Sequence, residues 1–116
     1  MIPTLLFIIA TDPRTDHRPA EAIRIAAGVG AWKSVRVALY LREAAVLALG
    51  HDVEPLVDYE NYTSYLPMLL DGSSPIYVQR GAPLLPPPDE RPPALEEIDD
   101  AQLAELSANS TYVLRF

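Results

Sequence analysis

The 116-residue sequence contains no cysteine, which excludes disulfide bonds, thiolate metal sites and every reaction that uses a cysteine nucleophile. Positive charge is scarce, because nine Lys and Arg stand against sixteen Asp and Glu, a formal net charge of −7. Such a chain is a poor binder of nucleic acid. No apolar run reaches the roughly 18 residues of a membrane helix, and no secretory signal opens the chain. We therefore expect a cytoplasmic protein with neither nucleic acid nor membrane as a partner.

Sequence motifs that mark common catalytic sites are also missing. The segment 28–33 begins like a dinucleotide fingerprint, but Lys33 occupies the third glycine position and the segment ends a predicted helix. The sequence has neither a phosphate-binding Gly-x-x-x-x-Gly-Lys loop nor a Gly-x-Ser-x-Gly nucleophile elbow. Histidine occurs only at positions 17 and 51. We predict no cofactor and no bound metal, and expect a protein that is not an enzyme.

The apolar content of 49% is enough for one hydrophobic core, and we interpret residues 1–116 as a single domain. Six of the twelve prolines fall between residues 83 and 93. Proline lacks a backbone N–H and fixes φ, so this stretch is neither helix nor inner strand. Residues 81–98 are predicted to be an extended connection over the surface. Residues 81–116 also hold seven of the sixteen acidic residues and only two basic ones.

The apolar pattern predicts alternating strands and helices. Residues 4–10 are an unbroken apolar run, typical of a strand covered on both faces. Strands are predicted at residues 4–10, 34–40, 75–79 and 111–116, with residues 51–57 as a possible fifth. Helices are predicted at residues 19–32, 42–49, 60–71 and 99–107. This alternation indicates an α/β fold: a three-layer α/β/α sandwich around a mainly parallel sheet of four to five strands.

Two of these helices predict self-association. The helix over residues 19–32 is apolar almost all round, and residues 44–49 are poorly amphipathic. A helix of this kind is usually buried on more than one side, whereas a sheet covers only one. We therefore expect a homo-oligomer in which a second copy covers these helices.

Polar residues follow three of the predicted strands. Ligands of open α/β sheets bind beyond the carboxyl ends of the strands, so these residues are candidate ligand contacts. The arginines among them either converge on a small anion or pair with Asp12, Asp16 and Glu43; we favour the pairing. No catalytic residue is assigned. The ten candidate ligand-binding residues are Thr11, Asp12, Arg14, Asp16, His17, Arg18, Arg42, Gln79, Arg80 and Gly81.

Five segments together carry a family resemblance. They are residues 5–14, 22–28, 35–41, 45–49 and 75–82. In order and hydrophobicity they resemble the DsrE/DsrF-like family of small bacterial sulfur-relay proteins. The resemblance implies a three-layer sandwich and assembly into trimers or hexamers. It also implies a sulfur-carrying cysteine in the loop at residues 79–81, where this chain has Gln79, Arg80 and Gly81.

The missing thiol excludes persulfide transfer by this route. We therefore expect a non-catalytic, oligomeric DsrE-like protein that binds or regulates another protein or a small ligand. The alternative is an anion-binding protein or an enzyme acting on a small anionic metabolite at the strand ends, with His17 next to Asp16 as a base and its orienting carboxylate.

Overall fold

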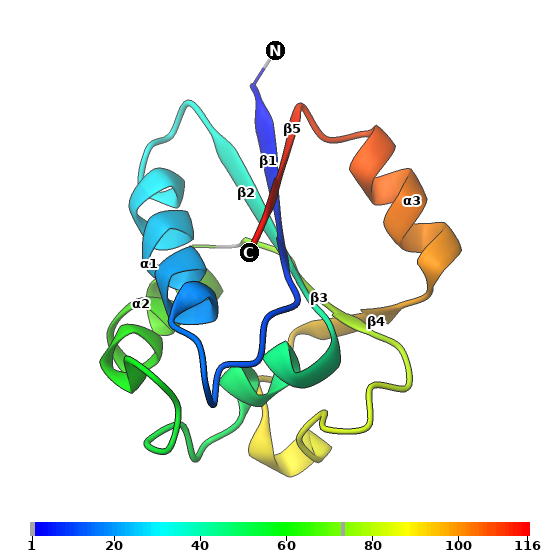
Figure 1. Cartoon of the computed structure of the whole chain (residues 1–116). Helices are drawn as coiled ribbons and strands as arrows, with labels where there is room; N and C mark the ends of the chain where they lie inside the picture. Colours follow the sequence, from blue (N-terminus) through cyan, green and yellow to red (C-terminus); the bar gives the residue numbers. More distant parts are fainter. Residues whose placement is uncertain (1, 73) are drawn as a thin grey trace.

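The computed structural model describes residues 2–72 and 74–116 and contains one five-stranded sheet (Figure 1). The strand order is β4-β3-β2-β1-β5, and every neighbouring pair is parallel. The predicted mainly parallel α/β sheet is therefore confirmed. The strands are β1 (Thr4–Ile9), β2 (Arg36–Leu41), β3 (Ile76–Gln79), β4 (Leu95–Ile98) and β5 (Tyr112–Arg115).

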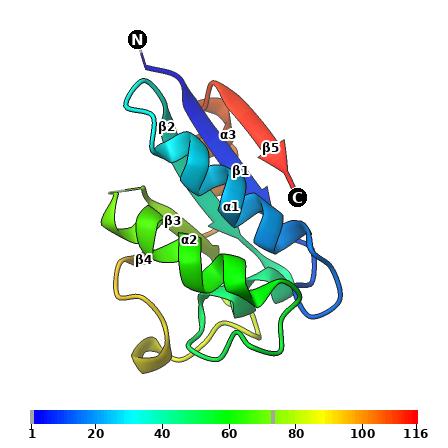
Figure 2. The same ribbon diagram turned by 90° about the vertical axis from the view of Figure 1, so that its left-hand side faces the viewer.

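Helices cover both faces of the sheet, giving the three layers expected from the sequence (Figures 1 and 2). On one face, α1 (Arg18–Gly30) and α2 (Tyr59–Asp71) lie side by side. On the other face α3 (Asp100–Ala108) lies alone. A 3₁₀ helix, η1 (Glu43–Leu49), follows β2, and a single 3₁₀ turn, η2 (Pro88–Glu90), lies in the proline-rich segment. No helix within residues 2–72 or 74–116 is long and apolar enough to cross a membrane.

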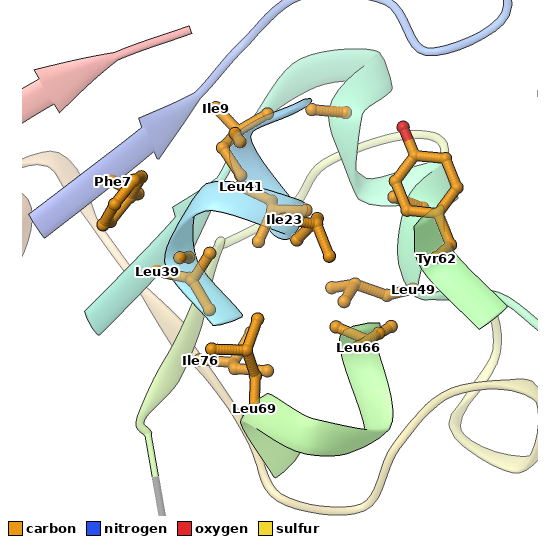
Figure 3. Close-up of a cluster of buried hydrophobic side chains, with 14 of the residues drawn as sticks. Phe7, Ile9, Ile23, Leu39, Leu41, Leu49, Tyr62, Leu66, Leu69 and Ile76 are labelled. Atoms are coloured by element: carbon orange, nitrogen blue, oxygen red, sulfur yellow. The ribbon is translucent and has the colours of Figure 1, made fainter. Parts of the chain in front are cut away.

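The main core lies between the sheet and the pair α1 and α2 (Figure 3). Residues two apart on a strand point to the same face, so Phe7 and Ile9 meet Leu39 and Leu41 there. Helix α1 contributes Ile23 and several alanines, whose small side chains let the helix approach the sheet closely. All these side chains are excluded from solvent.

The core on the α3 side is much smaller. It consists of Leu6, Ile8, Ala38, Tyr40 and Ile98, with four half-buried neighbours. None of the side chains of α3 is buried. The start of α3 is nevertheless well defined by a capping box. The Asp99 carboxylate accepts the N–H of Gln102 at 2.8 Å, and the Gln102 side chain accepts the N–H of Asp99 at 2.9 Å.

The prediction of a surface connection over residues 81–98 was wrong in its last part. Residues 95–98 form β4, the fifth strand, whereas residues 51–57, the predicted fifth strand, contain turns and no strand. No proline occurs after Pro93, so residues 94–98 keep the N–H groups that strand pairing needs. An edge position also tolerates the exposed side chains of Glu96 and Glu97.

The two predicted helices that were expected to self-associate correspond to α1 and η1. The helix predicted at residues 42–49 is the 3₁₀ helix η1, and Gly50 after it is extended, with φ −78° and ψ 172°. The two helices that we expected a second copy to cover are partly buried within the chain, and no partner chain is present to test that expectation. Helix α1 buries six of its residues, and η1 buries Ala45, Val46, Ala48 and Leu49. Helix α2 supplies much of this cover for α1.

Candidate functional site

All five strands end at the same edge of the sheet, here called the carboxyl edge, and the ten candidate residues lie there or in the loops that follow. The loop after β1 folds back on itself. The Arg14 side chain donates to both carboxylate oxygens of Asp12, at 3.0 and 2.9 Å, and its backbone N–H donates to Oδ1 at 2.9 Å. These hydrogen bonds lower the pKa of Asp12. The charge of Arg14 is thus matched within its own loop; Thr11, one residue earlier, is half-buried.

Asp16, His17 and Arg18 lead into α1. The Asp16 carboxylate accepts the backbone N–H of Arg18 at 2.9 Å, which fixes the first turn of the helix. His17 Nδ1 lies 3.8 Å from the same carboxylate oxygen, beyond hydrogen-bond distance, and both His17 and Arg18 are exposed. In this geometry Asp16 serves the backbone of α1 and does not orient the imidazole of His17.

A small cluster of polar residues, Arg42, Glu43 and Gln79, joins the ends of β2 and β3. Gln79 Oε1 accepts the backbone N–H of Glu43 at 2.9 Å, and Gln79 Nε2 lies 3.4 Å from Glu43 Oε1. Arg42 lies 3.7 Å from the same carboxylate. Glu43 has φ +52°, in the left-handed region that few non-glycine residues adopt. Because β2 and β3 are neighbours, this strained residue is held by the side chain at the end of the next strand.

Arg80 points away from this group, towards α3. Its side chain donates to the carbonyl of Glu97 at 3.2 Å and to the Gln102 side chain at 3.4 Å, and it lies 3.6 Å from Asp99. Gly81 follows in a turn with φ +77°, a backbone conformation that favours glycine. Arg80 therefore ties the loop after β3 to the start of α3.

The contacts sort the ten candidates into four local groups instead of one cluster. Arg14 pairs with Asp12 and Arg42 with Glu43, two of the ion pairs favoured from the sequence. Arg80 pairs with Asp99, a residue that became available only because β4 completes the sheet beside β3. Arg18 receives its contact from Asp16 through the backbone alone. Gln79 and Arg42 are the two candidates from different strands that Glu43 brings together.

Tyr40 belongs to the carboxyl edge and was missed from the sequence. It is fully buried on the α3 face, and its hydroxyl has no hydrogen-bond partner among the described residues. Burial raises the pKa of its phenol, and the charges of Asp100 and Glu43 raise it further, while Arg42 opposes them. The available sequence signal was a hydroxyl-bearing residue within the aliphatic second half of β2. Across residues 2–72 and 74–116, no group of three or more His, Asp or Glu side chains is placed to hold a metal ion.

Comparison with known proteins supports the fold and leaves the activity open. No protein-family model and no curated protein sequence matches the chain. Among solved structures, the chain is similar to the YchN protein from E. coli, with a TM-score of 0.78 and 20% identical residues. The match covers 99% of this chain and 100% of that one. YchN has a DsrE-like fold, so the chain shares the fold expected from the sequence resemblance.

Proposed function

We propose that this chain is a DsrE-like protein without persulfide-transfer activity, which acts in the cytoplasm as a non-catalytic, oligomeric binding or regulatory protein. One observation carries the proposal: the loop after β3 holds Gln79, Arg80 and Gly81 where the sulfur carriers place their cysteine. The Gln79 amide and the Arg80 guanidinium are used in contacts with Glu43 and with the start of α3. That loop supports structure and offers no nucleophile.

The oligomeric part of the proposal rests on an uncovered surface along β5. In Figure 2, β5 lies beyond α1 with no helix over it. Its side chains on the α1 side include Tyr112 and Leu114, which are 63% and 37% exposed. Parallel strands are ordinarily covered on both faces. We propose that a second copy covers this surface, in the trimer or hexamer that the family resemblance implies.

Light scattering coupled to size-exclusion chromatography tests this assembly. The wild-type chain is expected to elute as a multiple of 12.8 kDa, and Leu114→Lys to shift the mass towards the monomer. Leu84→Lys is the matched control, because Leu84 is 39% exposed but lies in the proline-rich segment. A wild-type monomer at micromolar concentration, or an equal loss of mass in both variants, would contradict the proposal.

A second candidate function is favoured by Tyr40. An unpartnered buried hydroxyl costs stability, and such groups are found where a ligand or ordered water completes the hydrogen bonding. Arg42 directly follows β2, the strand of Tyr40, and Gln79 ends the neighbouring strand β3. These side chains support a small anion as the ligand, which is either bound or chemically transformed at the carboxyl edge.

Thermal shift measurements with phosphate, sulfate and citrate separate the two candidate functions. An anion site at the carboxyl edge predicts stabilisation of the wild type that Tyr40→Phe and Arg42→Gln each reduce, while Arg24→Gln, on the exposed side of α1, has no such effect. Absence of stabilisation by every anion would eliminate this candidate. An enzymatic version further requires an activity that His17→Ala abolishes without unfolding the chain.

A further inference from the structure

The opposite, amino-terminal edge of the sheet contains a cleft of about 530 Å³. It exists because the two central strands start at different levels. Strand β2 begins at Arg36, but its first partner in β3 is Ile76, opposite Leu39. Residues 36–38 therefore pair with β1 on one side and have no β3 neighbour on the other. We call this space the amino-edge cleft; its lining residues are Thr4, Gly30, Val35, Arg36, Val37, Ala38, Gly72, Ser74, Pro75, Tyr77 and Leu106.

Pro75 keeps the amino-edge cleft open. The N–H of Leu39 donates to the Pro75 carbonyl at 3.1 Å, beside Leu39 and Ile76, the first β2–β3 pair among the described residues. If the same parallel register continued, the next hydrogen bond back along the pair would need an N–H from Pro75. Proline has no N–H to donate, so the ladder ends there.

The charge of the cleft is opposite to that of the whole chain. Among the described residues that line it, Arg36 is the only charged one, in a protein of net charge −7. Arg14, Arg24, Arg42, Arg80 and Arg91 each lie within 4 Å of a carboxylate. Arg36 makes no such pair with any residue within 2–72 or 74–116. An exposed guanidinium without an internal carboxylate suits a bidentate oxyanion.

The rest of the lining favours an apolar body on the bound molecule. Val35, Pro75, Tyr77 and Leu106 form much of the wall, and the hydroxyl-bearing Thr4 and Ser74 add polar groups. A mostly apolar cleft of this volume with a few polar groups is typical of sites for small organic ligands. Beyond Tyr77 and Leu106 a second groove is lined by Glu96 and Glu105. Those carboxylates disfavour a second negative charge on the far side of the ligand.

We propose that the amino-edge cleft binds a small organic oxyanion, with its carboxylate or phosphate on Arg36 and its apolar part against Tyr77 and Leu106. The site is distinct from the carboxyl edge, because it lies where β1 and β2 begin and not where they end (Figure 1). It stands whether or not the function proposed above is correct.

Nuclear magnetic resonance titration of the full chain tests the site. Phenyl phosphate and benzoate supply an oxyanion with an apolar ring, inorganic phosphate supplies the anion alone, and benzyl alcohol supplies the ring alone. We expect phenyl phosphate or benzoate to shift the amide signals of residues 35–38 and 77, and to bind more tightly than either partial probe. Arg36→Gln is expected to weaken binding about tenfold or more, as for loss of a charged hydrogen-bond partner.

Arg115→Gln is the matched control, since Arg115 is also an exposed arginine on a strand and points to the α3 face. Its affinity for the probes should equal that of the wild type, and circular dichroism should show both variants folded. Equal affinity of Arg36→Gln and wild type would overturn the proposal. So would shifts confined to the carboxyl edge, or no shifts at about 10 mM probe, where even millimolar binding is visible.

Discussion

At the scale of single residues, two tyrosine hydroxyls, those of Tyr40 and Tyr62, are buried without hydrogen-bond partners among the described residues, and each is expected to lower the stability of the chain. Tyr62, on α2, is only 2% exposed and lies at the rim of the main core (Figure 3). Burial raises the pKa of its phenol, and nearby Asp58 adds to this shift. Its ring fills space between α2 and the rest of the core, while its oxygen gains nothing that offsets desolvation.

We expect Tyr62→Phe to raise the free energy of unfolding by about 1 kcal/mol, since it removes a buried hydroxyl and keeps the ring. The gain should grow in alkali. Below pH 10, the ordinary tyrosine value, both states keep the proton; above it the unfolded chain loses the proton first, so the wild type loses about 1.4 kcal/mol per pH unit for this group. Denaturant unfolding at pH 7 and at several alkaline pH values measures both effects.

Tyr59→Phe is the control for this prediction, because Tyr59 lies on the same helix but is 37% exposed. It should leave both the stability and the alkaline profile unchanged. Destabilisation by Tyr62→Phe would show that the hydroxyl has a partner, such as an ordered water.

The candidate site was only partly predictable at this scale. Arg14 and Asp12 are two residues apart, so their ion pair follows from sequence proximity. The partners of Gln79 and Arg80 lie 36 and 19 positions away, and only the sheet order brings them together. The Asp99 contact also depended on β4, which the prolines concealed.

At the scale of elements, two glycines show how backbone conformation affects stability where side-chain packing does not interfere. A Cβ at Gly28 or at Gly81 would meet no atom within 4 Å. Gly28 has an ordinary helical conformation in α1, whereas Gly81 has φ +77° in the turn after β3. The two positions thus differ in backbone conformation and share open surroundings.

We expect Gly28→Ala to stabilise the chain by up to about 1 kcal/mol and Gly81→Ala to destabilise it by about 1 kcal/mol. The reasons are helix propensity at the first position and left-handed strain at the second. Thermal and urea unfolding of the two variants provide the measurement. Changes of the same sign would mean that packing, and not φ, decides the outcome at one of the positions.

Most elements were predictable because their apolar pattern is strong. The predicted limits of the strands at residues 4–10 and 75–79 and of the helix at residues 60–71 lie within one residue of β1, β3 and α2. Strand β4 was not predictable, since its four residues, Leu-Glu-Glu-Ile, are few and do not alternate between apolar and polar. Its place at an edge, paired on one side only, explains why so weak a pattern suffices.

At the scale of the whole molecule the two faces of the sheet are unequal. The face under α1 and α2 carries the large core, and the face under α3 a small one. Local opening requires less free energy where few apolar contacts are broken. The sandwich should therefore open first on the α3 side.

Hydrogen exchange measures this difference. We expect the amides of α3 to exchange at least about tenfold faster than those in the middle of α1, which buries six residues against none for α3. Measurements at several protein concentrations, checked for mass by light scattering, would separate any effect of the proposed second copy. Equal protection of the two helices at all concentrations would contradict the prediction.

Fold class was predictable at this scale, but strand order was not. Unbroken apolar runs indicate a parallel sheet, yet nothing in residues 95–116 shows that β4 and β5, successive in the chain, lie at opposite edges. Helix α3 spans that distance across the less covered face (Figure 1).

This strand order has a consequence for synthesis on the ribosome. Strand β1 is made first, but its second neighbour is β5, and the bond between Thr4 and Thr111 joins residues 107 positions apart. Until those late residues emerge, one side of β1, which is apolar from Leu5 to Ile9, has no hydrogen-bonding neighbour. The nascent chain therefore exposes an unpaired, apolar strand edge for most of its translation. This is the period in which protection by a chaperone would matter most.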